Sequence, residues 1–121
     1  NPDWIWIKSR SAATDHALYD VVRGAQARVE SNNSGAEVTS DDGVTAFNSA
    51  GFTLGTLAQV NTNAATYAAW CWDAGTSTVS NTTGSIASQV RANVSAGFSV
   101  VTYTGTGVQA LLDTGLVLFR I

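Results

Sequence analysis

The chain has 121 residues, of which 45% are hydrophobic and only 12% charged, and its formal net charge is −3. This length suits one domain with a modest core. Six basic residues scattered from Lys8 to Arg120 exclude the dense basic patch needed to bind nucleic acid or an anionic membrane, and no apolar run approaches the roughly 20 residues of a membrane span.

Strand signals dominate the first half of the chain. The aromatic and β-branched run Trp4–Lys8 predicts a strand that is buried on both faces or nearly so. Apolar residues separated by turn residues predict further strands over 17–23 and 27–31, a short edge strand over 36–39, and a hairpin formed by 44–47 and 51–55.

The strongest strand signal in the middle of the chain is residues 66–72. Alternation places Tyr67, Ala69 and Cys71 on one face, and Ala68, Trp70 and Trp72 on the other. A loop is predicted over 74–84, strands over 86–90, 98–104 and 116–121, and at most a turn or two of helix over 55–63 and 108–113. These elements predict an all-β fold, an antiparallel β-sandwich with little helix, as one module over residues 1–121.

Residues that could carry catalysis or hold a metal are sparse. His16 is the only histidine, too few for a zinc site or a catalytic triad, and we expect it to be structural, either hydrogen-bonded or exposed. Asp41 and Asp42 before Gly43 are typical of a turn and lack the spacing of a calcium loop. The sequence therefore predicts no catalytic residue, no metal site and no cofactor.

The single cysteine and the start of the chain lead to two further expectations. Cys71 cannot form an intrachain disulfide, and its apolar neighbours favour a buried thiol that acts as a small hydrophobic side chain. The chain begins with Asn1 and has no stretch resembling a signal peptide, so we expect a processed product or a segment of a longer or tandem-repeat chain.

Four tryptophans form two pairs spaced two residues apart, so each pair shares one face of its strand. Packing in the sandwich interior is the favoured interpretation of these residues. The alternative is an exposed platform on which a sugar ring or a partner protein packs. The candidate contact residues of such a platform are Trp4, Trp6, Tyr67, Trp70 and Trp72.

Several stretches together resemble a recurrent element of marine-phage tail-fibre and virion structural proteins. They are Pro2–Ser11, His16–Asp20, Phe47–Phe52, Tyr67–Trp72 and Gly97–Gly105. The resemblance implies a concanavalin-A-like, laminin-G-like jelly roll on a virion surface or another extracellular appendage. It implies copies of the chain and other virion proteins as partners, offers host-surface glycans as candidate ligands, and supplies no catalytic residue.

The order of these stretches departs from the pattern of that family. The stretch Gly97–Gly105 resembles one that opens a unit of the family, and Pro2–Ser11 resembles one that comes later. This reversal predicts a permuted or tandem module. The strand-like ends, Trp4–Lys8 and Leu116–Ile121, are then expected to pair with a neighbouring subunit by strand addition.

Three functions are compatible with these sequence features. The first is a non-catalytic structural protein of a virion or appendage, with an extracellular filament subunit as a variant, and it requires self-association. The second is a monomeric, lectin-like carbohydrate-binding module. The third is a secreted glycosidase domain, which requires two acids about 5–10 Å apart in a groove, and no such pair stands out.

Overall fold

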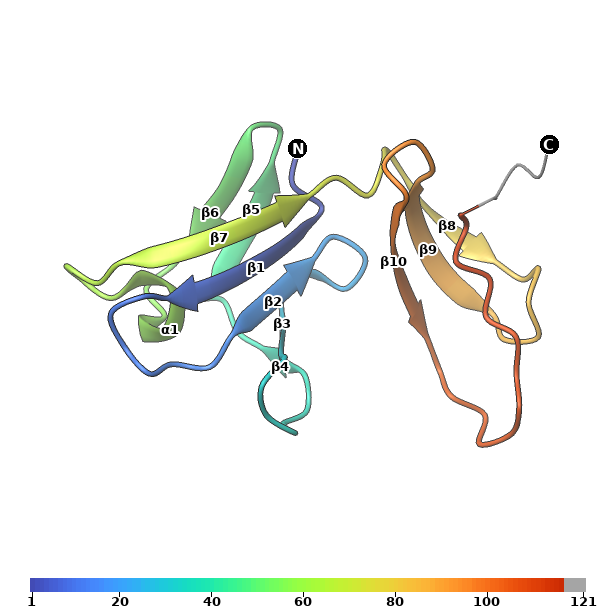
Figure 1. Ribbon diagram of the computed structural model, residues 1–121, viewed down its shortest axis with the longest axis horizontal. Helices are drawn as coiled ribbons and strands as arrows, with labels where there is room; N and C mark the ends of the chain where they lie inside the picture. The colour runs from blue at the N-terminus through green and yellow to red at the C-terminus, as the bar shows by residue number, and fades with distance from the viewer. Residues whose placement is uncertain (117–121) are drawn as a thin grey trace. The chain divides into compact units, whose positions relative to one another are not determined.

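A computed structural model describes residues 1–116 and divides the chain into two compact units, Asn1–Trp72 and Asp73–Ile121 (Figure 1). Within the described residues the regular structure is almost entirely strand, every strand pairing is antiparallel, and helix is limited to one short segment. This confirms the all-β antiparallel class with little helix. The jelly-roll topology and the single module over 1–121 stay predictions.

Unit 1 is built on a five-stranded sheet with the order β4-β3-β2-β1-β7. Its strands are β1 (Trp4–Ser9), β2 (Ala17–Asp20), β3 (Gly24–Glu30), β4 (Val38–Thr39) and β7 (Tyr67–Trp72). The short edge strand predicted over 36–39 and the long strand predicted over 66–72 are both confirmed.

Strand β1 has partners on both sides, since β2 and β7 each pair with it along most of its length. The prediction that Trp4–Lys8 is completed by a neighbouring subunit is therefore wrong. The reason is that the chain returns at residues 67–72 and fills that side of β1 itself. Residues 117–121 of the other predicted terminal strand lie outside the described residues.

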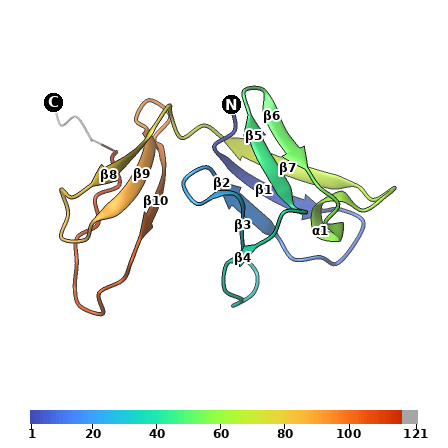
Figure 2. The ribbon, with the colours of Figure 1, turned by 180° about the vertical axis from the view of Figure 1, so that it is seen from behind.

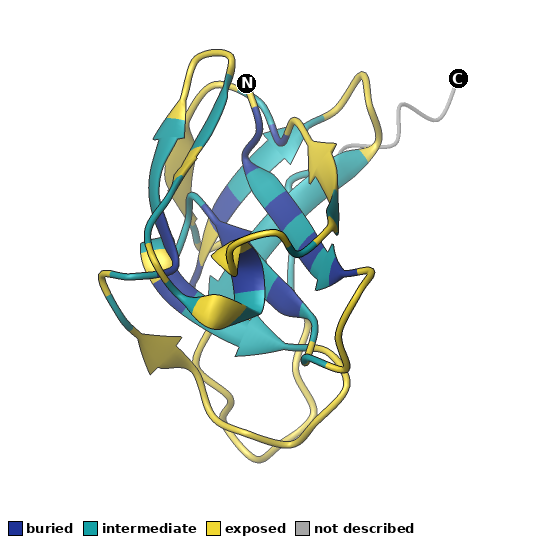
Figure 3. Cartoon of the chain, turned by 90° about the vertical axis from the view of Figure 1, so that its left-hand side faces the viewer, coloured by how far each residue is buried: buried dark blue, intermediate teal, exposed yellow. Residues whose placement is uncertain are grey.

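A hairpin and a helical turn form a second layer over one face of this sheet. The predicted hairpin is confirmed as β5 (Val44–Asn48) and β6 (Gly51–Leu54), and the expected helical turn is α1 (Ala58–Asn61). The core lies between the layers, and its buried residues alternate with less buried ones along the strands (Figure 3). They are Ile5, Ile7, Ala17, Tyr19, Val44 and Val60.

Strand β1 is not buried on both faces as predicted. Ile5 and Ile7 are at most 3% exposed and face the core, whereas Trp4 and Trp6 are only partly buried on the other face. The alternation of a strand sends neighbouring side chains to opposite faces, and only one of the two faces is covered by the second layer of unit 1.

The strand predicted over 17–23 ends at Asp20 because that carboxylate organises a turn. Asp20 Oδ1 accepts hydrogen bonds from the backbone N–H groups of Val22 and Arg23. The Arg23 guanidinium then joins Asp20 Oδ2 at 2.6 Å and Glu37 at 3.1 Å. These ion pairs tie the β2–β3 turn to the residue that precedes edge strand β4.

Unit 2 is a three-stranded sheet of order β10-β9-β8, formed by β8 (Thr78–Asn81), β9 (Ser88–Asn93) and β10 (Phe98–Tyr103) (Figure 2). The following segment runs back along the sheet, where the Ser85 N–H donates to the carbonyl of Leu111 at 2.9 Å. Gly115 lies so close to Val90 that a Cβ on Gly115 would be 2.8 Å from Val90 Cγ1. This segment helps to bury Val90, which is 1% exposed.

Three sequence predictions in unit 2 are corrected by the structure. Strand β8 lies inside the predicted loop over 74–84, because its hydroxyl-rich residues resemble a loop and their pairing with β9 makes the strand. The strand predicted over 86–90 begins at Ser88 and extends to Asn93. Residues 108–113 form no helix and instead lie in the extended segment beside Ser85.

Candidate functional site

Four tryptophans gather on the face of the unit 1 sheet that is opposite the core, and we call them the tryptophan face: Trp4, Trp6, Trp70 and Trp72. Strand register sets Trp4 opposite Trp72 and Trp6 opposite Trp70. The ring centroids of these two pairs are 4.7 Å and 5.7 Å apart, and Trp4 and Trp6 meet edge to face at 6.2 Å. Such tilted and edge-to-face contacts hold the rings in a fixed array.

The tryptophan face is separate from the core, which contradicts the favoured prediction that these residues fill the sandwich interior. Trp70 is 49% exposed and Trp72 is 38% exposed. Sequence spacing correctly paired the tryptophans on shared faces. It could not identify the covered face, because that depends on where the hairpin β5–β6 and α1 fold back.

His16 fixes the orientation of one ring of the tryptophan face. The Trp6 indole Nε1–H donates a hydrogen bond of 2.8 Å to His16 Nδ1, and the two rings are 5.5 Å apart. An accepting Nδ1 places the ring proton of neutral histidine on Nε2. His16 is therefore hydrogen-bonded, which is one of the two states expected of it from the sequence.

Apolar side chains extend the tryptophan face across the sheet. Leu18 on β2 pairs with both Trp6 and Val29, so these residues share a face with the tryptophans. The sheet of unit 1 therefore has apolar side chains on both faces, although the hairpin layer covers only one of them.

Tyr67, the fifth candidate contact residue, lies on the other face of β7. Its ring packs against the core, and its hydroxyl accepts from the Thr62 N–H and donates to the carbonyl of Ala58, both at 2.9 Å. Tyr67 thus anchors the loop between α1 and β7. The structure does not bring it together with the four tryptophans.

Cys71 is exposed, so the prediction of a buried thiol is wrong. It shares a face with Ile5, its cross-strand partner, but it lies on edge strand β7, where the second layer covers less of the sheet. Partial burial nevertheless raises the pKa of the Cys71 thiol above its ordinary value.

Alkylation of Cys71 is expected to be slower in the folded protein than in the denatured chain at mildly alkaline pH. The thiolate is the nucleophile, and the raised pKa lowers the thiolate fraction of the folded protein. The two rates should converge as pH rises, because the thiol is accessible. Mass spectrometry of iodoacetamide-treated protein over a pH series measures both rates, and complete protection at every pH would contradict an exposed Cys71.

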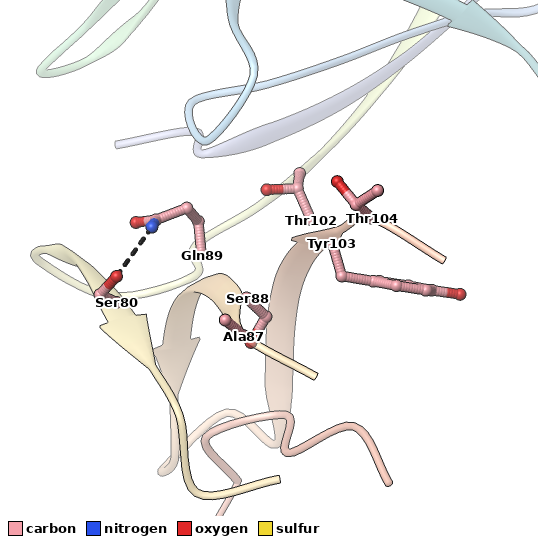
Figure 4. Close-up of a pocket in the computed structure, with 7 residues that line it drawn as sticks. All are labelled: Ser80, Ala87, Ser88, Gln89, Thr102, Tyr103 and Thr104. Atoms are coloured by element: carbon pink, nitrogen blue, oxygen red, sulfur yellow. Dashed lines mark hydrogen bonds between the residues drawn. The ribbon is translucent and has the colours of Figure 1, made fainter. Parts of the chain in front are cut away.

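A concave site lies in unit 2, at the end of its sheet (Figure 4). This hollow of about 330 Å³ has no charged lining residue, and Gln89 Nε2 donates to Ser80 Oγ at 2.9 Å within it. Its lining consists of Ser80, Ala87, Ser88, Gln89, Thr102, Tyr103 and Thr104. Hydroxyl and amide groups of this kind suit a neutral polar ligand or ordered water rather than an ion.

Arg23, the basic residue that lines a hollow beside β3 and β4, is already paired inside the protein. Its guanidinium bonds the carboxylates of Asp20 and Glu37 and the carbonyl of Leu18, so two carboxylates already balance its charge. Nowhere in residues 1–116 do three or more His, Cys, Asp or Glu side chains gather in a way that could hold a metal ion. Among the same residues, no helix has the length and apolar character to cross a bilayer.

Comparison with known proteins gives a family match without an assigned activity. A family model described as "Domain of unknown function (DUF7483)" matches residues 1–118. No curated protein and no solved structure matches the chain.

Proposed function

The chain belongs to the DUF7483 family, and we propose that it is a non-catalytic structural module that assembles with copies of itself on a virion or other extracellular appendage. A phage tail fibre is the setting that its sequence resemblance favours. Other proteins of the same appendage would be its further partners, and a host-surface glycan is a candidate ligand.

The observation that carries this proposal is the tryptophan face. Large aromatic side chains are common where protein surfaces bind one another, because they bury a large area in few conformations. Trp70 is half exposed and is held by contacts to Trp6, so little ordering remains to be done when a partner covers it. The low content of charged residues supports the same proposal, since interface cores are depleted of charge.

The energetic scale can be set from Trp70 alone. A buried tryptophan covers roughly 200 Å², so covering its exposed half removes on the order of 100 Å² from water. At about 25 cal/mol per Å² this contributes about 2.5 kcal/mol to association. That contribution corresponds to roughly 70-fold in the association constant.

Trp70→Ala is therefore expected to weaken self-association by roughly 70-fold while leaving the core of unit 1 intact. Sedimentation velocity over a concentration series, with circular dichroism as a check of folding, measures both effects. Tyr103→Ala is the matched control, because Tyr103 is also a half-exposed aromatic residue but lies on β10, outside the tryptophan face. A wild-type chain that stays monomeric throughout the series would refute the proposal of self-assembly.

The second candidate function is a monomeric carbohydrate-binding module, and the exposure of Trp70 and Trp72 on one face favours it. Side chains two residues apart in a strand lie about 7 Å apart, which allows two rings to contact neighbouring sugar units. A monomer whose tryptophan fluorescence responds to a glycan in the wild type, and not in Trp70→Ala, would favour this second function over assembly.

A further inference from the structure

We propose that edge strand β7 pairs antiparallel with β7 of a second copy, with Ala69 on the two-fold axis, and joins two unit 1 sheets into one continuous sheet. This inference rests on the proposed self-assembly and names the surface that carries it. It concerns the edge of the sheet, whereas the tryptophan face lies on its broad side.

The backbone of β7 presents hydrogen-bonding groups on its open side. The Thr66 carbonyl accepts a hydrogen bond from the Arg10 N–H, and the Trp72 carbonyl accepts one from the Asp3 N–H. Because backbone groups alternate in direction along a strand, those of every second residue point toward β1, namely residues 66, 68, 70 and 72. The backbone groups of Tyr67, Ala69 and Cys71 consequently point the other way. Within residues 1–116, no strand pairs with β7 on that side.

The two edges of the sheet differ sharply in their protection. Edge strand β4 has two residues, and the ion pair of Glu37 with Arg23 lies beside it. Such short, charged edges discourage pairing with other chains. Strand β7 has six residues, Tyr-Ala-Ala-Trp-Cys-Trp, with no charge, no proline and a regular register along β1. Strand β7 therefore has neither the short length nor the neighbouring ion pair that protects β4.

Geometry restricts how two copies of β7 can pair. A continuous sheet must keep core-side residues opposite core-side residues, and hydrogen-bonded pairs must use backbone groups that point outward on both strands. A two-fold axis through a peptide bond would set each residue opposite a residue from the other face of the strand. The axis must therefore pass through a residue of β7. Centring on Ala69 sets Tyr67 opposite the partner's Cys71, so each outward-pointing residue of β7 has a hydrogen-bonded counterpart.

Side-chain sizes also suit this register. Trp70 lies opposite the partner's Ala68, so a large ring meets a small side chain on the same face. The tryptophan face then continues from one copy into the next. This complementarity favours a second copy of the chain as the partner, because β7 supplies both the large and the small side chain of each pair.

Cysteine crosslinking tests the register directly. In the proposed dimer the two Ala69 Cα atoms are about 5.5 Å apart, which lies within the span that a disulfide bridges. The 121-residue double variant A69C/C71S should therefore form a disulfide-linked dimer under mild oxidation, at twice the 12.6 kDa of one chain. The control S49C/C71S, with its cysteine in the exposed turn between β5 and β6, should remain mostly monomeric.

A charge placed on the edge supplies the complementary test. Ala69→Lys should shift the wild-type dimer to the monomer mass in light scattering, because it brings two like charges together at the axis. Ser49→Lys should leave the dimer mass unchanged. Association that survives Ala69→Lys, with no faster crosslinking of A69C/C71S than of its control, would overturn the edge dimer while leaving assembly through the tryptophan face standing. Growth into open filaments would instead indicate head-to-tail pairing with another edge and would also overturn it.

Discussion

Gly55→Ala is expected to destabilise unit 1 by about 2–3 kcal/mol, because the added methyl group has no room. A Cβ on Gly55 would lie 2.4 Å from the carbonyl oxygen of Asp42 and 2.7 Å from its carbonyl carbon. These are backbone atoms, so the strain cannot be relieved by turning a side chain. The Gly55 N–H also bonds the Gly43 carbonyl at 2.7 Å, which holds the two chain segments together.

Thermal unfolding followed by circular dichroism measures this effect, and we expect the Tm to fall by about 10 °C. Gly51→Ala is the matched control, since Gly51 begins strand β6, which ends one residue before Gly55, and a Cβ on Gly51 would meet nothing within 4 Å. Equal Tm values for the two variants would show that the contact between Gly55 and Asp42 is less rigid than the structure describes.

The Gly55 contact connects the core to the tryptophan face. Asp42 also accepts the Leu57 N–H at 2.7 Å, so the same carbonyl oxygen positions the start of α1. From α1, Val60 enters the core against the underside of β1. A looser layer would pack less tightly against Ile5 and Ile7 on the core face of β1. The same strand carries Trp4 and Trp6 on its opposite face, so these rings would also be held less firmly. A rigid tryptophan face therefore depends on a layer that lies behind it.

The sequence predicted most strands correctly because their apolar residues alternate clearly. The run over 66–72 and the hairpin around Asn48 are examples, and each emerged within a residue or two of its expected bounds. Strand β8 was missed because Thr78–Asn81 has little apolar character, and its pairing with β9 is a long-range property. Local sequence carries little information about strands of this kind.

The candidate site was only partly predictable, for a different physical reason. Two residues spaced two apart must share a face of a strand, and this correctly grouped Trp70 with Trp72. Which face becomes the core depends on the later path of residues 44–61, which no local pattern reveals. Cys71 was misassigned for the same reason, because its apolar neighbours hide the fact that β7 is an edge strand.

Gly75→Ala is expected to have the largest effect of the single substitutions considered, about 3–5 kcal/mol, because strain and collision act together. Gly75 has φ +98°, a region that residues with a side chain rarely adopt. A Cβ at this position would also lie 2.4 Å from the carbonyl oxygen of Ala92. Unit 2 has a single three-stranded sheet and a small core, so a loss of this size should unfold it.

Asp73 explains why the chain adopts this conformation at Gly75. Its Oδ1 accepts the Gly75 N–H at 2.6 Å and the Asn93 side-chain amide at 3.3 Å. The Gly75 hydrogen bond is the main cause that lowers the pKa of Asp73. Because the pKa of Asp73 is lower in the folded protein than in the unfolded chain, the ionised carboxylate stabilises the fold at pH values above the ordinary pKa of aspartate. This stabilisation is lost as the pH falls through the lowered pKa of the folded protein.

Hydrogen exchange of the 121-residue chain, with both units present, can localise the Gly75→Ala effect. Amides of β9 should lose protection in this variant, whereas amides of β1 and β7 should keep theirs, because unit 1 has its own core. Two control variants separate the causes. Gly97→Ala adds a side chain at φ +66° in open space, and Gly105→Ala adds one in open space without positive φ. Protection should decrease in the order Gly105→Ala, Gly97→Ala, Gly75→Ala, and equal loss in the last two would remove the Ala92 collision from the explanation.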